Sequence, residues 1–241
     1  MANGCWRVEL ANGVVADAER VVLATGAHPR SLNYDCSHEI SLDTALNKTE
    51  LAGHVTEHDT VAVVGSAHSA VLVMKFLSEL STGRIINLYT KPLVYPQAMD
   101  GWVLHGDSGL KGVAAQWAKN VLEKNLPCKL VRLHNTEDAR KAWLPICTKI
   151  IYAAGFERNP IPACQPIMSY DTSTGKIASG LFGIGIAFPE VAVDPLGNEE
   201  HKIGLGSFMQ HALEQLPEWM HSKSALCRFN KFEELFTVCV L

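Results

Sequence analysis

Hydrophobic residues in this chain occur in short runs that are separated by glycine, proline and polar turns. The clearest unit has an apolar run at 61–64, a turn of small residues at 65–67, a helix-length segment to 80 and a second apolar run at 85–89. A strand, a tight turn, a helix and a second strand in this order predict a βαβ unit with parallel strands.

Further runs on both sides of this unit predict more of the same fold. Alternation at 6–10, followed by Asn12-Gly13, predicts an opening hairpin. Buried strands are expected from 21 and at 149–154, a further strand at 128–133, and a glycine-punctuated apolar strand at 181–189. Helices are expected at 42–51, 108–124 and about 203–216, and either a short helix or a hairpin turn at 137–143. The apolar end, 235–241, fits either a strand or a helix.

Two of these helices carry apolar residues at helical spacing, and we expect both faces to pack in the core. The residues are Leu110, Val113, Ala114, Trp117 and Val121 in one helix, and Leu205, Phe208, Met209, Ala212 and Leu213 in the other.

The turn after the run at 61–64 has the pattern of a nucleotide-binding turn. Gly65 stands where the chain must turn sharply, Ala67 takes the place of the second glycine of G-x-G-x-x-G/A, and Ala70 allows close packing of the helix on the strand. Such a turn directs the free N–H groups of the next helix toward a diphosphate. An ordinary strand, turn and helix without a ligand is the alternative interpretation.

The composition favours a globular protein without a nucleic-acid partner. The chain has 241 residues, 47% hydrophobic and 19% charged, with a formal charge of −4. No basic excess supports binding to a phosphate backbone. The apolar stretch 61–77 is interrupted by polar residues, so no membrane span is expected.

Seven scattered cysteines form no C-x-x-C or C-x4-C pair. Their odd number, without an N-terminal apolar leader, favours reduced thiols and a cytoplasmic location.

Four segments in order resemble the FAD/NAD(P)-binding pyridine nucleotide oxidoreductases, particularly their flavin-monooxygenase-like members. They are the "ATG-x-x-P-R" strand end within 21–30, the NAD(P)H-binding turn at 61–70, the "A-x-G-x-x-x-N" return within 150–159, and the closing flavin strand at 181–187. The resemblance spans roughly residues 6 to 216.

The resemblance implies an α/β fold in which a Rossmann-like NAD(P)H-binding domain, 59–155, is inserted into an incomplete FAD-binding domain formed by 1–58 and 156–241. Gly65, Ser66, Ala67, His68 and Ser69 would surround the NAD(P)H diphosphate, with Gly155 on the return strand. The flavin side would be lined by Thr25, Gly26, Gly183 and Gly185.

The position after the second strand bears on the choice between NADPH and NADH. NAD-specific sites carry an acid there, whereas this chain has Thr90 and Lys91. A lysine would attract a 2′-phosphate, which favours NADPH; a solvated loop lysine is the alternative.

Two departures from the family bear on FAD. Only 24 residues precede Thr25, so we expect the family's first flavin cradle to be missing from this chain, as in a fragment or a short form. The closing strand has Ile186 where the family has an acid. On these grounds FAD is expected to lack its diphosphate site here.

The expected function is an FAD- and NADPH-dependent, monooxygenase-like oxidoreductase of a small molecule, with dioxygen or a small acceptor receiving the electrons. The absence of paired cysteines excludes the disulfide reductase mechanism. The alternative is a non-catalytic nucleotide-binding or interaction remnant of such a protein. Neither catalytic residues nor the oligomeric state follow from the sequence.

Other polar clusters are weaker candidates. His54-Val55-Thr56-Glu57-His58 fits H-x-x-E-H but has no room for the helix that a zinc site requires, so we expect no metal. Asp100, His105 and Asp107 are interpreted as a solvated loop.

Overall fold

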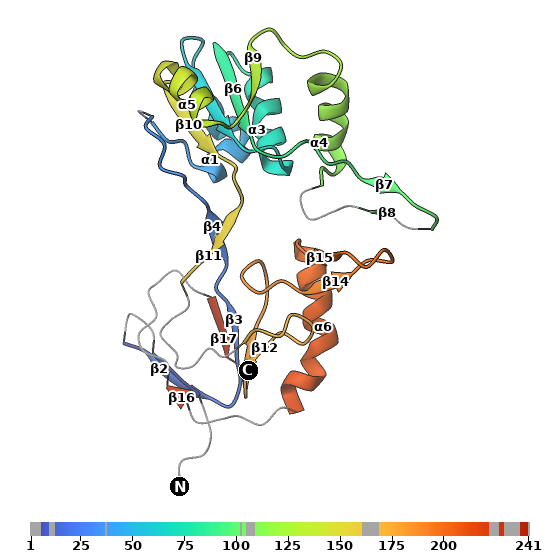
Figure 1. Ribbon diagram of the computed structural model, residues 1–241. Helices are drawn as coiled ribbons and strands as arrows, with labels where there is room; N and C mark the ends of the chain where they lie inside the picture. The colour runs from blue at the N-terminus through green and yellow to red at the C-terminus, as the bar shows by residue number, and fades with distance from the viewer. Residues whose placement is uncertain are drawn as a thin grey trace. The chain divides into compact units, whose positions relative to one another are not determined.

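The computed structural model describes residues 6–9, 13–36, 38–101, 103–104, 109–160, 169–221, 227–228 and 237–240. They form two compact units (Figure 1): unit 1 comprises Met1–His28 and Glu157–Leu241, and unit 2 comprises Pro29–Phe156. The chain passes between the units twice, and the connecting strands β4 (Ala27–Pro29) and β11 (Phe156–Arg158) pair with each other. The predicted α/β class is confirmed.

Unit 2 contains a sheet of four parallel strands in the order β10-β5-β6-β9. The strands are β5 (Thr60–Val64), β6 (Arg84–Tyr89), β9 (Leu130–His134) and β10 (Lys149–Tyr152). From β5 the chain moves outward to β6 and β9, then returns to β10 on the other side of β5. The strand order therefore reverses between β5 and β10, as in a Rossmann-like sheet.

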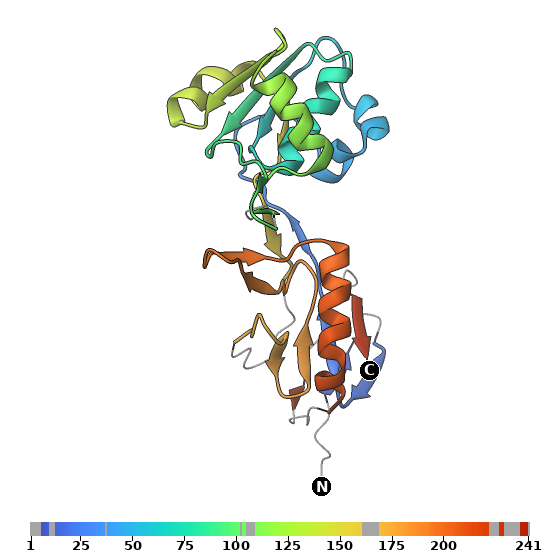
Figure 2. The same ribbon diagram turned by 90° about the vertical axis from the view of Figure 1, so that its right-hand side faces the viewer.

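Helices cover both faces of this sheet. On one face lie α1 (Leu42–Leu46), α2 (Lys48–Ala52), α3 (His68–Glu79) and α4 (Gly112–Trp117), which continues as the π-helix η1 (Ala118–Leu122). In Figure 2, turned so that this side faces the viewer, α4 lies in front of the sheet. On the other face lie residues 32–36, α5 (Glu137–Trp143) and the 3₁₀ turn η2 (Leu144–Ile146). The hairpin β7 (Gln97–Ala98) and β8 (Val103–Leu104) completes the unit.

Residues 29–58 belong to unit 2, whereas the sequence placed the first boundary at residue 58. Leu42, Ala45 and Leu51 are buried in the same core cluster as α3, and Glu39 bridges to Ile150 beside β10. These apolar contacts hold the segment on the parallel sheet. The return crossing, between Phe156 and Glu157, lies next to the expected residue 155.

In unit 1, β13 (Leu181–Gly183) and β3 (Val21–Ala24) are parallel neighbours at the centre of a sheet with the order β12-β13-β3-β17. Its outer strands, β12 (Lys176–Ala178) and β17 (Thr237–Val240), are antiparallel to their neighbours. β17 shows that the apolar end of the chain forms a strand.

The predicted opening hairpin is confirmed by β1 (Trp6–Glu9) and β2 (Val15–Ala18), which pair antiparallel; β16 (Cys227–Arg228) runs parallel to β1. Asn12 lies outside the described residues. Another hairpin is formed by β14 (Val191–Val193) and β15 (Glu199–His201).

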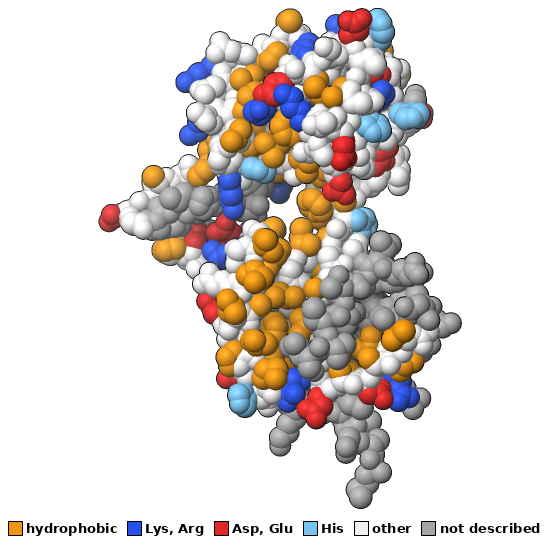
Figure 3. Space-filling model, turned by 180° about the vertical axis from the view of Figure 1, so that it is seen from behind, with side chains coloured by type: hydrophobic (Ala, Val, Ile, Leu, Met, Phe, Trp, Pro, Cys, Tyr) orange, Lys and Arg blue, Asp and Glu red, His pale blue; other side chains and the backbone are white. Residues whose placement is uncertain are grey.

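The apolar face predicted for the last helix is not in the core. α6 (Leu205–His221) buries His211 and Trp219, whereas Leu205, Met209 and Leu213 are 78%, 57% and 69% exposed. Trp219 stacks on Phe182 at a centroid distance of 5.0 Å and donates from Nε1 to the carbonyl of Thr174 at 2.8 Å. This contact determines which side of α6 is buried. Because Trp219 follows Pro217, the buried side of the helix continues beyond that proline. Figure 3 shows hydrophobic side chains gathered on the unit that carries this helix.

Three other expected elements differ in their bounds. The helix expected at 42–51 is split at Asn47, because its side chain accepts from the amides of Thr49 and Glu50 and starts α2. The strand expected at 181–189 ends at Gly183, because Gly185 has φ +83° and Phe188 folds back against Gly183.

The helix expected at 108–124 is described from Gly112, and its candidate caps Asp107 and Ser108 lie outside the described residues. Its buried residues are Ala114, Ala118 and Leu122, and Leu110, which precedes the helix, is also fully buried. Val113 is exposed and was wrongly assigned to the core, because the buried residues repeat every four positions from Ala114 and Val113 lies on the neighbouring, solvent-facing side of the first turn.

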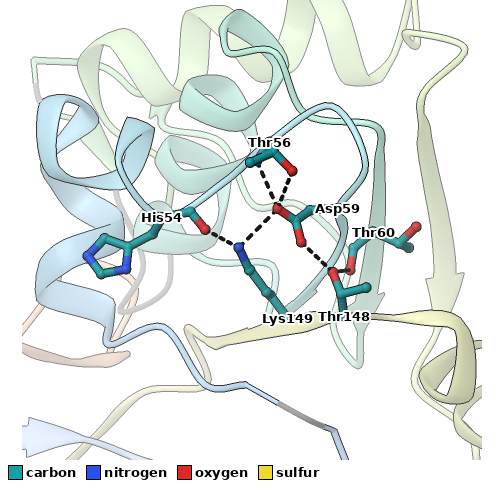
Figure 4. A network of polar contacts seen from close by, with 6 residues as sticks. All are labelled: His54, Thr56, Asp59, Thr60, Thr148 and Lys149. Carbon is teal, nitrogen blue, oxygen red and sulfur yellow. Dashed lines mark hydrogen bonds and ion pairs between the residues drawn. The ribbon is translucent and has the colours of Figure 1, made fainter.

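A polar network joins the amino ends of β5 and β10 (Figure 4). Lys149 Nζ lies 2.9 Å from Asp59 Oδ2 and also donates to the carbonyl of His54. Thr56 and Thr148 donate to the same carboxylate through their hydroxyls at 2.9 and 2.8 Å. Burial alone would raise the pKa of Asp59, but the hydrogen bonds from Lys149, Thr148 and Thr56 outweigh it and hold the pKa well below the usual range.

Candidate functional site

The turn between β5 and α3 is built around Gly65. Its φ of +131° lies in a region that residues with a side chain rarely adopt, and a Cβ there would collide with the backbone carbonyl of Ala153. The Gly65 amide donates to the carbonyl of Leu88 at 2.9 Å, and its carbonyl accepts from Asn87 Nδ2 at 2.8 Å. Glycine is required here because the end of β10 passes directly over the turn.

The N-terminus of α3 has no side-chain cap. α3, 12 residues long, follows Ala67, whose side chain cannot accept a hydrogen bond, so no capping side chain satisfies the first amides of the helix. Ser66 does not cap the helix either; its hydroxyl donates to the carbonyl of Lys91 at 2.8 Å. This bond ties the loop after β6 to the glycine turn.

A cavity of about 420 Å³ opens at this edge of the sheet, and all of its lining residues belong to unit 2. It is bounded by the turn at 65–67, by the loop 90–92 after β6 and by residues 153–155 after β10. This is the crevice at the carboxyl ends of the strands where the strand order reverses, the usual ligand position in doubly wound sheets. The lining includes two cationic side chains, Arg30 and Lys91.

His68 and Ser69 form the first turn of α3 beside this cavity. His68 is half-buried, and its Nδ1 accepts from the amide of Lys111 at 3.4 Å. Burial, and to a lesser degree the charge of Lys111, lower the pKa of His68. The imidazole is therefore neutral at pH 7, and the bond at Nδ1 assigns its proton to Nε2, where it can be donated.

The cavity also has a polar wall that the sequence did not single out. Tyr34 and Asn135 line it, and Asn135 Nδ2 donates to the hydroxyl of Tyr34 at 3.3 Å. Arg140, on α5, donates to Asn135 Oδ1 at 3.0 Å and lies 5.1 Å from the centre of the Tyr34 ring. The position of Asn135 directly after β9 was a detectable signal, whereas nothing local pointed to Tyr34.

A second network missed from the sequence supports the turn from inside the sheet. Asn87 is fully buried in β6; its Nδ2 donates to the carbonyls of Val63 and Gly65, and its Oδ1 accepts from Arg132 Nε at 3.0 Å. A polar residue in the middle of the apolar run 85–89 was the signal that could have found it.

The other predicted group lies in unit 1, at the carboxyl ends of the parallel strands β3 and β13. Thr25 and Gly26 follow β3, Gly183 ends β13, and Gly185 follows it. Asn159 joins this group: its Nδ2 donates to the carbonyl of Thr25 at 2.8 Å, and its amide donates to the carbonyl of Gly26. The Thr25 side chain is buried, and its hydroxyl has no hydrogen-bond partner among the described residues.

The predicted site residues thus form two groups. Gly65, Ser66, Ala67, Thr90, Lys91 and Gly155 line the cavity of unit 2, with His68 and Ser69 next to them; Thr25, Gly26, Gly183 and Gly185 gather in unit 1.

The weaker candidates show no such assembly. His54, Glu57 and His58 are exposed in turns after α2, and Asp100 is exposed; His105 and Asp107 lie outside the described residues. Within the described ranges, no three His, Cys, Asp or Glu residues are grouped as metal ligands. Cys36, Cys128 and Cys147 are free thiols. None of the helices in the described part of the chain is both long and apolar enough to cross a membrane.

Comparison with known proteins finds a similar monooxygenase sequence, although no family model matches this chain. Monooxygenase AgnR1 from Paecilomyces divaricatus is 34% identical over 236 residues, which cover 84% of this chain and 60% of that protein. The chain therefore spans about three fifths of the length of this relative.

A solved structure with a TM-score above 0.5 has the same fold as this chain. A mutant flavin monooxygenase from Stenotrophomonas maltophilia superposes with a TM-score of 0.54 at 13% identity, covering 92% of this chain and 68% of that chain. An FAD-dependent pyridine nucleotide-disulphide oxidoreductase from Desulfovibrio vulgaris gives a TM-score of 0.47 at 14% identity, over 91% of this chain and 59% of that one. The chain is thus similar in sequence to a monooxygenase over part of that protein's length, and it shares the fold of a flavin monooxygenase.

Proposed function

We propose that the protein is a monooxygenase-like oxidoreductase that binds NADPH in the cavity of unit 2 and one side of FAD at the glycine group of unit 1. The observation that carries this proposal is the Gly65 turn, which places an uncapped helix N-terminus at the cavity where the strand order reverses. The monooxygenase relative extends the proposal to a small-molecule substrate.

The residues of unit 2 fit a pyridine dinucleotide. The first amides of α3 would receive the diphosphate, because their donors have no side-chain cap. His68 would line this position as a neutral donor through Nε2, and residues 153–155 would border the far end of the cavity.

The loop after β6 supports NADPH over NADH. Thr90 and Lys91 occupy the position of the ribose-binding acid, and the Ser66 bond to the Lys91 carbonyl holds the loop next to the turn. The Lys91 ammonium would pair with the 2′-phosphate, whereas a carboxylate would repel it.

The residues of unit 1 fit one side of a flavin. The buried, unpartnered hydroxyl of Thr25 requires a partner that the described residues do not supply, and a polar flavin atom would provide it. Open space at the Cβ positions of Gly185 and, on all but one side, Gly26 allows a ligand to approach the backbone. When bound, FAD supplies the redox chemistry that links NADPH oxidation to the reduction of dioxygen or another small acceptor.

A second candidate function is nucleotide binding without catalysis. Ile186 stands in place of the acid expected on the flavin strand, so only unit 2 has a full set of residues for a diphosphate among the described ones. This chain would then bind NADPH without turning it over.

One experiment separates these functions. The purified full chain is incubated with FAD, its visible absorbance is recorded after desalting, and NADPH binding and oxidation are measured by calorimetry and at the nicotinamide absorbance. Retained flavin with NADPH oxidation supports the oxidoreductase; NADPH binding without flavin or oxidation supports the second candidate. Failure to bind NADPH would exclude both.

A further inference from the structure

Tyr34 separates two cavities of unit 2. It lines the cavity at the Gly65 turn and also a second cavity of about 690 Å³, which is bordered by α5 and η2. The ring is held in place by its neighbours: its backbone amide donates to the Tyr152 hydroxyl at 2.7 Å, the Tyr152 ring packs edge-on at 5.9 Å, and Arg140 lies over it at 5.1 Å. Tyr34 is thus a fixed aromatic wall.

Asn135 completes this wall, and its hydrogen bonds leave donors for a ligand. Its backbone amide donates to the Tyr89 carbonyl at 2.8 Å, which fixes it to the end of β6. Its Oδ1 is taken by Arg140, and one amide hydrogen by the Tyr34 hydroxyl. Among the described residues, neither the other amide hydrogen nor the Tyr34 hydroxyl proton has an acceptor.

The strand order indicates which part of NADPH would meet this wall. The diphosphate belongs at the end of β5, where α3 begins, and the adenosine ribose at the end of β6, beside Thr90 and Lys91. The next strand outward is β9, and Asn135 directly follows it. A base attached to that ribose therefore reaches Asn135 and Tyr34.

We infer that Tyr34 and Asn135 form the adenine subsite, with the base stacked on the Tyr34 ring, and that Arg140 is the residue that positions both. This inference rests on the proposed NADPH site. Arg140 lines only the second cavity, so it acts through Tyr34 and Asn135 instead of touching the base.

The test measures binding to the full chain by calorimetry, with NADPH, NADH, 2′,5′-ADP and nicotinamide mononucleotide as probes. The variants are Tyr34→Leu, Tyr34→Phe, Arg140→Met and Arg140→Lys. Lys141→Met is the matched control, because Lys141 neighbours Arg140 on α5 and lines only the second cavity. Thermal melting verifies that each variant is folded.

Tyr34→Leu should weaken 2′,5′-ADP roughly 5- to 150-fold, the range for losing one base–aromatic stack, and Tyr34→Phe should lose less because the ring remains. Arg140→Met should weaken NADPH, NADH and 2′,5′-ADP by the same factor and leave the mononucleotide unchanged; Arg140→Lys should recover part of the loss. Lys141→Met should alter none of these.

Three results would overturn the adenine subsite while NADPH binding itself remains: unchanged 2′,5′-ADP affinity in folded Tyr34→Leu, an equal loss for the mononucleotide, or a shifted NADPH to NADH ratio in Arg140→Met. A wild-type chain that binds none of the probes contradicts the proposed NADPH site instead.

Discussion

The side-chain nitrogen of Asn87 lies 2.8 Å from the carbonyl oxygen of Gly65. A buried amide thereby joins the nucleotide-type turn to β6, and through Arg132 to β9. The conformation of the turn is consequently coupled to the interior of the sheet and does not depend on the loop alone.

Replacing Asn87 with leucine should therefore destabilise the protein. The substitution leaves Arg132 Nε without its acceptor and the Gly65 carbonyl without its donor, which costs about 2–4 kcal/mol for buried groups. Urea unfolding measures the loss. Asn125→Leu, at an exposed amide, is the control and should change stability by less than about 0.5 kcal/mol; equal effects would contradict the buried network.

Gly65→Ala should abolish NADPH binding, because the new methyl group meets the Ala153 carbonyl and forces the end of β10 away from the turn. Gly101→Ala separates this collision from backbone strain, since Gly101 has φ +75° and open space around it. The control should lose only about 1–2 kcal/mol of stability and keep its affinity. Calorimetric titration with NADPH distinguishes the two variants.

Lys91→Ala should weaken NADPH binding about tenfold or more and change NADH binding little, because only NADPH carries the phosphate that pairs with the ammonium. The ratio of the two dissociation constants is the measurement. An equal loss for both nucleotides would assign Lys91 to the solvated loop instead.

The Asp59 carboxylate makes stability dependent on acid pH. Because folding lowers the pKa of Asp59, its contribution is complete above the ordinary value of about 3.9 and is lost as the pH falls through that value toward the folded one. Asp59→Asn should cost about 3 kcal/mol at pH 7, and the gap from wild type should narrow below pH 4. Urea midpoints between pH 7 and 3 test this; exposed Asp100→Asn should leave the profile unchanged.

Thr25→Val should stabilise the chain in the absence of flavin while weakening flavin binding. The hydroxyl is buried without a partner among the described residues, so removing it at nearly constant volume relieves about 1 kcal/mol of desolvation cost. Melting temperature without FAD and fluorescence titration with FAD measure the two effects. A lower melting temperature would mean that the hydroxyl is satisfied in the folded protein.

Local patterns sufficed for the parts of the fold in which each residue's role is set by its neighbours in sequence. Alternating or continuous apolar runs predicted β5 and β6, and a small-residue turn predicted the start of α3. For 137–143 the sequence left a short helix or a hairpin turn open, and the structure has the helix α5 there. The candidate residues from Gly65 to Ser69 could be chosen because one turn carries them all.

Long-range packing decided what local patterns could not. The exposed stripe of α6 has the same spacing as a core stripe, and only Phe182, distant in sequence, determines that Trp219 is buried instead. Likewise, Tyr34 has no local sign of a binding role, because its position depends on Asn135 and Arg140, more than 100 residues away.

The Asp59 network secures the amino ends of the parallel strands, whereas the cavity opens at their carboxyl ends. β5, with five residues, separates the two by roughly 17 Å. Substitutions that retune ligand preference at 90–92 or 153–155 are therefore remote from the ion pair that secures the sheet. Of the two segments, 153–155 is constrained by the contact of buried Ala153 with Gly65 and by the positive φ of Gly155, so the loop 90–92 is where ligand specificity can change with least effect on the sheet.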